Sequence, residues 1–471
     1  MSNAQVQDSN PEPPQPTARP AGGTEHSWCR AVPIGTGITV LALLLSKPPD
    51  ISLLQDALHK LQNYHPILRS KLHFDSLTNT FSFLTPPLPH LQISSFDLSS
   101  TYQIIPNNHR DDVTPFHLIL EHELNQNAWQ NNTDDTDLFF VTTYALNETR
   151  WAVVFRLHTS VCDRASAVSL LREMLKLVGM EREGGGIEEE YDRKSEVSLG
   201  IEDFIPSGKA NKPFWARGLD VLGYSLNSFR QSYIDFVDAS SPRCSKVARL
   251  RLTSVETQRL VQGCNSRGIK LSGALAAAGL IAARSSKCLS NQQREKYAVV
   301  TLIDCRSILD PVLSSNHLGF YHSAILNTHD VDGTETLWEL ATRICTSFAN
   351  AKNNNKHFTD MSDMNFLMCK AIENPGLTPS STLRTAFISV FEDPVIDESN
   401  RVLHQEIGLE DYIGCSSVHG VGPSIAIFDT LRDGQLDCAC VYPSPVHSEE
   451  QMQKLIDEMK MILVDGGNSE S

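Results

Sequence analysis

The sequence is short of positive charge, and this shortage restricts the partners that the protein can bind. It carries 40 lysine and arginine residues against 56 aspartate and glutamate residues, which gives a formal net charge of −16 at pH 7. Nucleic-acid backbones and anionic membrane surfaces attract proteins through clustered lysine and arginine. We therefore expect neither a nucleic acid nor a membrane as a partner.

Long apolar runs, a secretory leader and paired cysteines are also missing. The apolar run at 38–45 is far shorter than the about 20 residues of a membrane-spanning helix. Residues 1–20 are rich in proline, glutamine and asparagine and lack the basic and apolar regions of a signal peptide. The eleven cysteines are odd in number and include no C-x-x-C pair. These features predict reduced thiols in a cytoplasmic protein.

Several sequence signatures of catalysis are absent as well. There is no G-x-S-x-G string, which argues against a serine nucleophile elbow. No pair of histidines has metal-ligand spacing such as H-E-x-x-H. The three glycines at 184–186 follow no strand pattern and lie among acidic residues, so they do not predict a phosphate-binding loop. We expect no metal and no bound cofactor.

The length and the alternation of strand and helix patterns predict two α/β domains. A chain of 471 residues exceeds the usual size of a single hydrophobic core. Composition marks 1–25 as a disordered tail, and the charged, glycine-containing stretch after residue 180 as a linker and crossover segment over 181–245. We expect domains at 26–180 and 246–471, each a mixed sheet flanked by helices.

One joint between a strand and a helix carries side chains capable of chemistry. The segment RLHTSVCDRASAVSLLREML, residues 156–175, runs from an apolar strand through a turn that contains His158 and Asp163. Without further information, a structural interpretation is favoured: Asp163 caps the following helix, and His158 is a hydrogen-bonded residue at the strand end.

Five segments in this order resemble the chloramphenicol-acetyltransferase-like superfamily, which includes condensation domains, alcohol acyltransferases and plant CoA-dependent acyltransferases. They are HPILRSKL (65–72), the segment 156–175, the helix pair at 253–282, LIDCRSIL (302–309) and NHLGFYHSAI (316–325). The resemblance implies two similar domains with a channel between them. It also implies a monomer that transfers an acyl group from a thioester, with acyl-CoA as the co-substrate, to a small-molecule alcohol or amine.

The resemblance also assigns roles to residues of the 156–175 segment, and here the chain departs from the superfamily's HHxxxDG motif. The second histidine, which is the superfamily's general base, is Thr159 here, and His158 matches the first. By resemblance Asp163 is structural and pairs with Arg306, while Arg164 replaces the glycine at the channel mouth. A threonine hydroxyl is no general base near neutral pH, and the loss of such a base costs ~10²–10⁴ in rate.

The departure leaves three functional classes open, and catalytic activity itself is left undecided. The first is an acyltransferase that uses Thr159, a rotated His158, or an acceptor that needs little help from a base. Rotation is required because neighbouring residues of a strand point to opposite sides. The second is a lyase, cyclase or isomerase that works by orientation alone. The third is a non-catalytic binder of a small molecule or a protein.

Two further histidines are candidates to face the channel, and two classes of acyl donor fit the sequence. His322 and His419 fall in loops that are candidates to face the channel, together with Arg164. The DFGWG string of the plant CoA-dependent enzymes is absent, so the chain is closer to the condensation and alcohol acyltransferase branches. The donor can therefore be a CoA thioester or a carrier-protein thioester.

Overall fold

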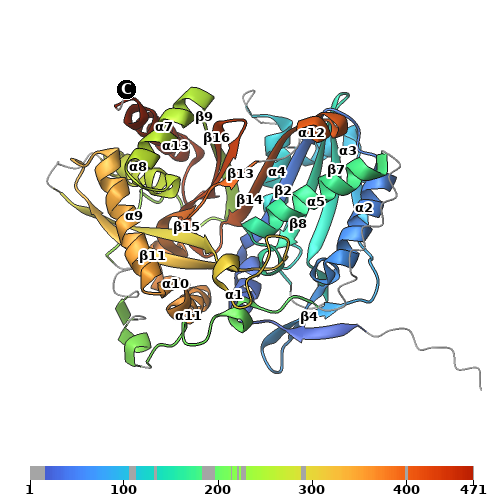
Figure 1. Ribbon diagram of the computed structural model, residues 1–471, viewed down its shortest axis with the longest axis horizontal. Coiled ribbons are helices and arrows are strands. Elements are labelled where there is room, and N and C mark those ends of the chain that lie inside the picture. Colours follow the sequence, from blue (N-terminus) through green and yellow to red (C-terminus); the bar gives the residue numbers. More distant parts are fainter. Residues whose placement is uncertain are drawn as a thin grey trace, which may run out of the picture.

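The computed structural model describes most of the chain as two α/β halves that lie side by side (Figure 1). The described residues are 16–105, 113–131, 135–182, 197–213, 215–219, 222–223, 230–287, 293–397 and 401–469. The expected fold class, mixed sheets flanked by helices in two lobes, is confirmed.

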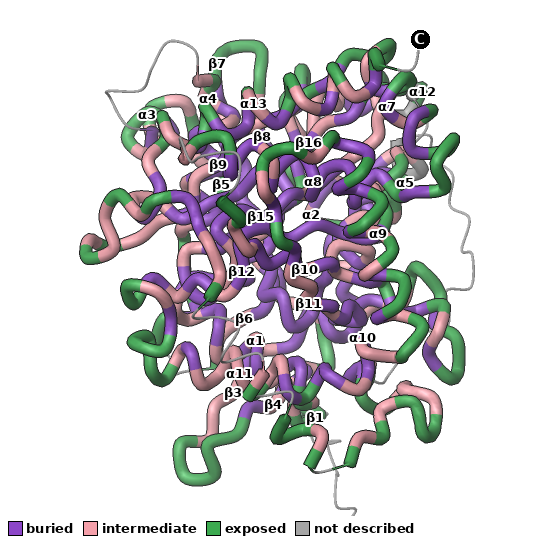
Figure 2. The backbone as a smooth tube through the Cα atoms, turned by 90° about the vertical axis from the view of Figure 1, so that its left-hand side faces the viewer, coloured by how far each residue is buried: buried purple, intermediate pink, exposed green. Residues whose placement is uncertain are grey.

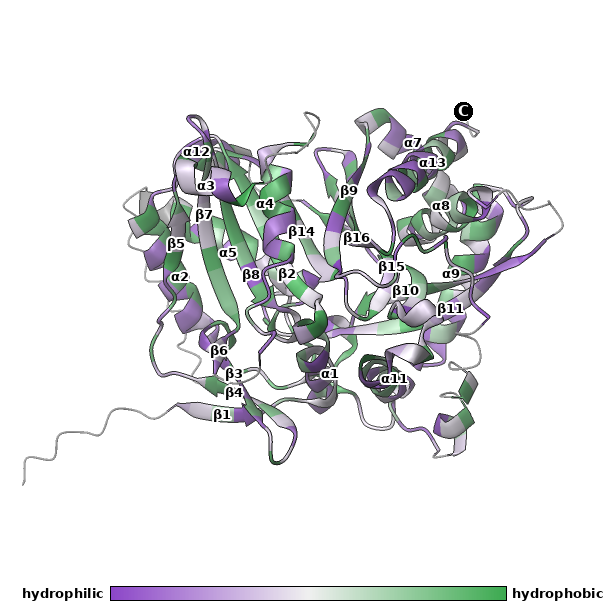
Figure 3. Ribbon diagram, turned by 180° about the vertical axis from the view of Figure 1, so that it is seen from behind, coloured by the Kyte–Doolittle hydropathy of each residue, from purple (hydrophilic) through white to green (hydrophobic). Residues whose placement is uncertain are grey.

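The N-terminal half is built on a five-stranded sheet with the order β14-β2-β8-β7-β5. Its strands are β2 (Thr36–Leu45), β5 (Ile93–Phe96), β7 (Phe139–Asn147), β8 (Arg150–His158) and β14 (Leu409–Val418). One face is covered by α2 (Ile51–Tyr64) and α5 (Arg164–Arg182), and the other by α4 (Pro115–Leu124), as the front and back views show (Figures 1 and 3). The helix α3 (Leu98–Ile104) packs beside β7.

A smaller sheet closes one end of this half, with the order β1-β4-β3-β6. It consists of β1 (Thr17–Pro20), β3 (Lys71–Asp75), β4 (Thr80–Thr85) and β6 (Thr136–Asp137), and α1 (Gly23–Ala31) follows β1. The expectation of a disordered tail over 1–25 is therefore wrong from residue 17 onwards. Antiparallel pairing with β4 and an ion pair of 2.7 Å between Arg19 and Glu25 hold this segment. Residues 1–15 lie outside the described residues, as does the glycine-containing part of the linker at 183–196.

The C-terminal half is built on a larger mixed sheet with the order β11-β10-β12-β15-β16-β9. Its strands are β9 (Cys244–Leu252), β10 (Glu295–Asp304), β11 (His322–Val331), β12 (Arg384–Phe391), β15 (Gly422–Arg432) and β16 (Gln435–Ser444), and β13 (Val395–Ile396) pairs with β15. The helices are α7 (Ser254–Ser266), α8 (Leu271–Ser285), α9 (Leu337–Asn353), α10 (Lys356–Thr359), α11 (Met361–Glu373) and α13 (Glu449–Asn468), whereas α12 (Arg401–Ile407) packs against α5 and β14 on the N-terminal half. The helices α7, α8, α9 and α13 pack together on one face of the sheet (Figure 1).

One strand of the C-terminal half joins the sheet of the N-terminal half, which the sequence boundaries did not anticipate. β14 belongs to the C-terminal half by sequence, but it pairs antiparallel with β2 at the edge of the N-terminal sheet. Ile413 lies opposite Ala42, and Cys415 lies opposite Val40. The domain expected at 246–471 therefore completes the sheet of its neighbour, and both halves contribute backbone to the space between them.

The strand β2 is almost continuously apolar, which fits its position inside a sheet that helices cover on both faces. β2 is buried at nine of its ten positions and reads TGITVLALLL, which is the pattern of a strand between two helical layers. Buried residues form the interior of both halves (Figure 2). No disulfide joins the cysteines that the structure describes. Among the helices of the described ranges, none is long and apolar enough to cross a membrane.

Candidate active site

A cavity of about 400 Å³ lies between the two halves and takes its lining from both. β2, its sheet neighbour β14, the turn at 159–164 and α5 form one side, whereas β10, β11, β12, β15 and α11 form the other. Most of the lining is apolar: Trp28, Phe320, Phe391 and three methionines of α11 (Met361, Met364, Met368). The volume and the lining are those of a site for a small organic molecule.

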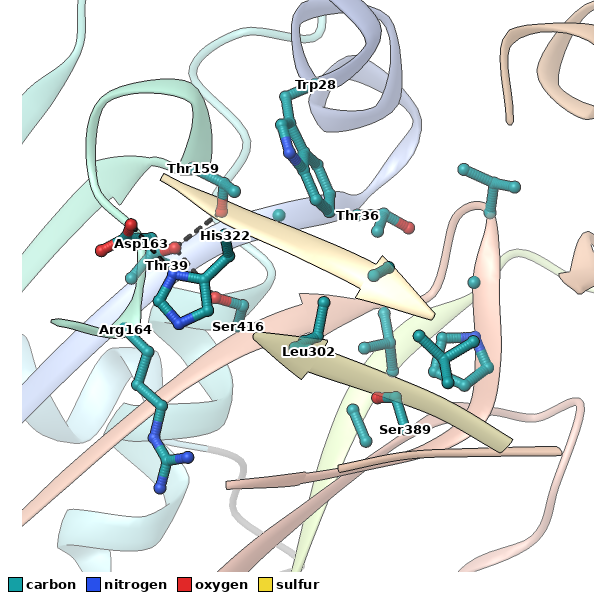
Figure 4. A pocket seen from close by; sticks show the side chains of 18 of the residues that line it. Trp28, Thr36, Thr39, Thr159, Asp163, Arg164, Leu302, His322, Ser389 and Ser416 are labelled. Atoms are coloured by element: carbon teal, nitrogen blue, oxygen red, sulfur yellow. Dashed lines mark hydrogen bonds and ion pairs between the residues drawn. The ribbon is translucent and has the colours of Figure 1, made fainter. Parts of the chain in front are cut away.

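A cluster of three hydroxyl groups interrupts this apolar lining. Thr39 Oγ1 lies 2.7 Å from Thr159 Oγ1 and 2.8 Å from Ser416 Oγ, so one hydrogen-bonded chain joins β2, the 159–161 turn and β14 (Figure 4). Gly37 makes the close approach possible: at its φ of +93° a Cβ atom would lie 3.1 Å from the Thr159 side chain. Thr159 lines the cavity, and its hydroxyl is hydrogen-bonded to that of Thr39.

Asp163 lies next to this cluster and is enclosed by charged and polar partners. Arg306 places Nη1 2.9 Å from Oδ2 and Nη2 3.0 Å from Oδ1 of the carboxylate. The backbone N–H groups of Ser166 and Tyr321 each donate a hydrogen bond of 2.8 Å. Burial opposes the charge, but Arg306 and then His322 outweigh it and hold the pKa of Asp163 well below its ordinary value.

These contacts show that Asp163 caps α5 and also braces the turn, so both sequence interpretations describe it. The pair with Arg306 that the resemblance implied is present, and it joins the two halves. Arg306 lies two residues after the end of β10. It also contacts the Asp304 carboxylate at 2.9 Å and donates a hydrogen bond to the carbonyl oxygen of His317. The loop that leads into β11 is thereby tied to the N-terminal half.

His158 points away from the cavity. Its side chain is fully buried, its Nδ1 accepts a hydrogen bond of 2.7 Å from the Ser160 hydroxyl, and its ring meets the Trp129 ring edge-on at 5.2 Å. Burial lowers the pKa of His158 to about 3. The ring lies on the opposite side of the strand end from Thr159, as strand alternation predicts. A rotated His158 is disfavoured because it would have to leave this packed position.

His322, by contrast, faces the cavity from the first position of β11. Its Nδ1 lies 2.9 Å from Oδ2 of Asp163, which is hydrogen-bonding distance, although the ring N–H is not aligned straight at that oxygen. The rings of Phe320 and Phe391 flank it with centroids at 6.3 and 5.9 Å. The sequence marked His322 as a channel candidate, but nothing in its spacing indicated the contact with Asp163, because the two residues are 159 positions apart.

A second cavity of about the same volume lies next to the main one, and Arg164 lines both. Arg164, Leu302, His322, Phe391 and Val395 line both cavities. The guanidinium group of Arg164 lies 4.2 Å above the Phe391 ring centroid and pairs with Asp429 of β15 at 2.9 Å. The second cavity is more polar and includes Asp304, Arg306, Ser307, Ser315, Glu392 and Asp393.

The prediction that His419 faces the channel is wrong for both cavities, since His419 lines neither. Its Nδ1 lies 3.0 Å from the Ser245 hydroxyl, and its ring presses against Gly35, where a Cβ atom would overlap it. Burial first, and then Arg384 and Arg243, lower the pKa of His419 to about 4. In the described part of the chain, no group of three or more histidine, cysteine, aspartate or glutamate side chains could hold a metal ion.

Comparisons with known proteins agree with this architecture. Residues 241–357 match the family described as phthiocerol/phthiodiolone dimycocerosyl transferase C-terminus. The TRI3 trichothecene 15-O-acetyltransferase from Fusarium sporotrichioides is similar in structure, with a TM-score of 0.73, 13% identity, and coverage of 96% of this chain and 95% of that one. No curated protein sequence matches the chain.

Two further solved structures share the fold. Polyketide synthase associated protein 5 from Mycobacterium tuberculosis has a TM-score of 0.63 and 17% identity, with 96% of this chain and 99% of that chain covered. The EpoB nonribosomal peptide synthetase cyclization-docking bidomain from Sorangium cellulosum has a TM-score of 0.63 and 14% identity, with 96% and 85% covered. The protein thus has the fold of the chloramphenicol-acetyltransferase-like superfamily, and the resemblance seen in the sequence is confirmed.

Proposed function

We propose that the protein transfers an acyl group from a thioester to an alcohol or amine acceptor bound between its two halves. The observation that carries this proposal is the pair of cavities, each of about 400 Å³, that share one wall next to a hydroxyl cluster. Transfer between two substrates needs two binding sites that bring the reacting groups together. Proximity and correct orientation of these groups supply much of the rate enhancement.

The acceptor belongs in the main cavity. Its lining of Trp28, Phe320 and the α11 methionines suits a compact apolar molecule with a single hydroxyl or amine. The hydroxyl chain of Thr39, Thr159 and Ser416 provides polar contacts where the acceptor's nucleophile has to be oriented.

The donor belongs in the second cavity, whose polar lining suits the amide-containing arm of a thioester. We take acyl-CoA as the first candidate donor and a carrier-protein thioester as the second, since both present the same arm. The reaction needs no resident cofactor, and we place the protein in the cytoplasm as a monomer that acts on small molecules in specialised metabolism.

The experiment is a screen of acyl-CoA thioesters of increasing chain length against apolar alcohols and amines. Release of free thiol and mass spectrometry of the product report transfer. We expect transfer with at least one donor and acceptor pair. The absence of product with every CoA and carrier-protein thioester, alongside clear ligand binding in the cavity, would contradict the proposal.

The presence of a threonine at position 159 favours a second candidate function, in which the cavity binds a molecule without acyl transfer. The hydroxyl at this position cannot remove a proton near neutral pH. A lyase, cyclase or isomerase that works by orientation, or a non-catalytic binder, would then use the same lining. In the screen, a ligand that binds and is converted to a rearranged product would indicate a lyase, cyclase or isomerase. A ligand that binds and is released unchanged would indicate a non-catalytic binder.

A further inference from the structure

We propose that His322 is the general base of this transfer, supplied from the C-terminal half in place of the residue at position 159. The inference rests on the proposed acyl transfer and names the group that removes the acceptor's proton. It follows from three observations: where His322 lies, which of its ring nitrogens is available, and what surrounds it.

His322 lies at the junction of the two cavities. It is one of the five residues that line both of them, so its ring is next to both the acceptor space and the donor space. The hydroxyls of Thr39, Thr159 and Ser416 line the same main cavity (Figure 4). A general base must be within hydrogen-bond reach of the proton that it removes, and this junction is where the acceptor and the thioester carbonyl would meet.

Asp163 decides which ring nitrogen is available. Because its carboxylate lies 2.9 Å from Nδ1, it favours the tautomer with the proton on Nδ1. Nε2 is then unprotonated and can accept a proton. No residue in the described part of the chain forms a hydrogen bond with Nε2, so it remains free for a substrate. Arg306 keeps Asp163 ionised, and the carboxylate can therefore stabilise the imidazolium when it forms.

The charged and titratable groups around His322 fit this role. Asp163 faces it from the N-terminal turn, with Arg306 behind that carboxylate. Asp304 is its register partner across β10 and β11, and Arg164 lines both cavities beside it. In acyl transfer by a histidine base, a carboxylate at Nδ1 orients the ring and Nε2 faces the substrate. His322 has this arrangement.

The acyl transfer requires no reactant other than the thioester and the acceptor. Nε2 of His322 takes the proton from the acceptor's O–H or N–H as that atom bonds to the thioester carbonyl carbon. A tetrahedral intermediate forms, its C–S bond breaks, and the departing sulfur takes the proton back from Nε2. The products are an ester or amide and a free thiol, and His322 returns to its starting state.

The test compares His322→Gln and His322→Ala with His158→Gln, a variant of a buried histidine outside both cavities. We expect a loss of about 10²–10⁴-fold in kcat for both His322 variants, with KM changed far less. His158→Gln should keep turnover within about threefold of the wild type. Added imidazole should restore part of the activity of His322→Ala, which a purely structural role would not allow.

A folded His322→Ala that turns over within about threefold of the wild type would overturn the inference and leave the proposed transfer standing. If His322→Ala does not fold, His322→Gln, which keeps a polar side chain at the position, provides the same comparison.

Alkylation by bromoacetyl-CoA adds a readout that requires no turnover, with mass spectrometry to locate the label. Label on His322 supports the inference even if no acyl group reaches an acceptor, in which case only the proposed function fails. Absence of label on His322 in a protein that binds the reagent counts against the inference.

Discussion

Nδ1 of His322 lies 2.9 Å from Oδ2 of Asp163, although the histidine begins a strand of the C-terminal half and the aspartate belongs to the N-terminal turn. The same carboxylate receives Arg306 from the end of β10. One buried carboxylate thus fixes a cation and an imidazole from the other half. The contact between the halves is for this reason both a structural support and a candidate catalytic arrangement.

Asp163→Asn should destabilise the protein strongly. The change leaves the buried Arg306 without its main counter-charge, and breaking such a pair from one side costs about 3–5 kcal/mol. Urea unfolding at neutral pH measures the loss of unfolding free energy. Asp304→Asn is the matched control, because Asp304 contacts the same guanidinium group but its side chain is 42% exposed; the expected cost is below about 1 kcal/mol. Equal losses for the two variants would contradict this.

Thr159→Val should reduce acyl transfer only modestly. It removes the hydrogen bond of 2.7 Å to Thr39 and preserves the side-chain shape, a change worth about 0.5–1.5 kcal/mol, or roughly two- to tenfold in kcat/KM. Steady-state kinetics of the folded variant check this. A loss of about 10³-fold or more would show that Thr159 has a chemical role that an orienting hydroxyl does not have.

The double variant Thr159→His with His322→Ala moves a histidine back to the position used by the superfamily. We expect it to recover part of the activity that His322→Ala alone loses, because both positions line the same cavity. The ratio of kcat for the double and the single variant is the measurement. No recovery in a folded protein, despite retained acceptor binding, would show that the cavity is not arranged for a base at position 159.

Arg164→Gly should join the two cavities and destabilise the protein. The variant removes the guanidinium group from the shared wall and leaves Asp429, which is 1% exposed, without its partner. Adding Asp429→Asn should restore most of the lost stability and leave the wall open. We expect the double variant to accept bulkier acyl donors, seen as a change in donor preference in kcat/KM. An unchanged preference would show that Arg164 does not limit the donor space.

His158 should make the protein sensitive to acid. Its folded-state pKa is about 3, far below the ordinary value of 6.5, so the unfolded chain takes up the proton first as the pH falls. Stability is therefore fully present above the ordinary pKa and is lost as the pH falls from there towards 3. His158→Gln should make this loss shallower by about one proton, or ~1.4 kcal/mol per pH unit. Urea unfolding between about pH 7 and pH 5 tests it; parallel slopes would contradict it.

The resemblance was sufficient for the fold and for the pair of Asp163 with Arg306, and local patterns were sufficient for the helix cap at Asp163. The strand, turn and helix of 156–175 are consecutive, and the resemblance supplied Arg306 as the partner. The pairing of β14 with the N-terminal sheet could not be predicted, because an alternating strand such as LEDYIGCSSV fits the edge of either sheet. Only the assembled halves show which edge it joins.

The histidines show the same limit. Strand alternation correctly set His158 apart from Thr159, since only neighbouring residues are involved. Whether His322 or His419 reaches the cavity depends on how the C-terminal half packs against the N-terminal half, and no local sequence pattern determines that. His322 is brought to Asp163 by the contacts of Arg306 with the preceding loop, whereas His419 packs against Gly35.

The most direct measurement is the turnover of an acyl-CoA thioester with a matched acceptor by the wild type, His322→Gln and His158→Gln, followed through release of free thiol. We predict that the wild type and His158→Gln turn over at similar rates and that His322→Gln is slower by about 10²–10⁴-fold. Equal turnover by all three proteins would contradict a catalytic role for His322. An inactive wild type, tested with every donor, would contradict acyl transfer itself.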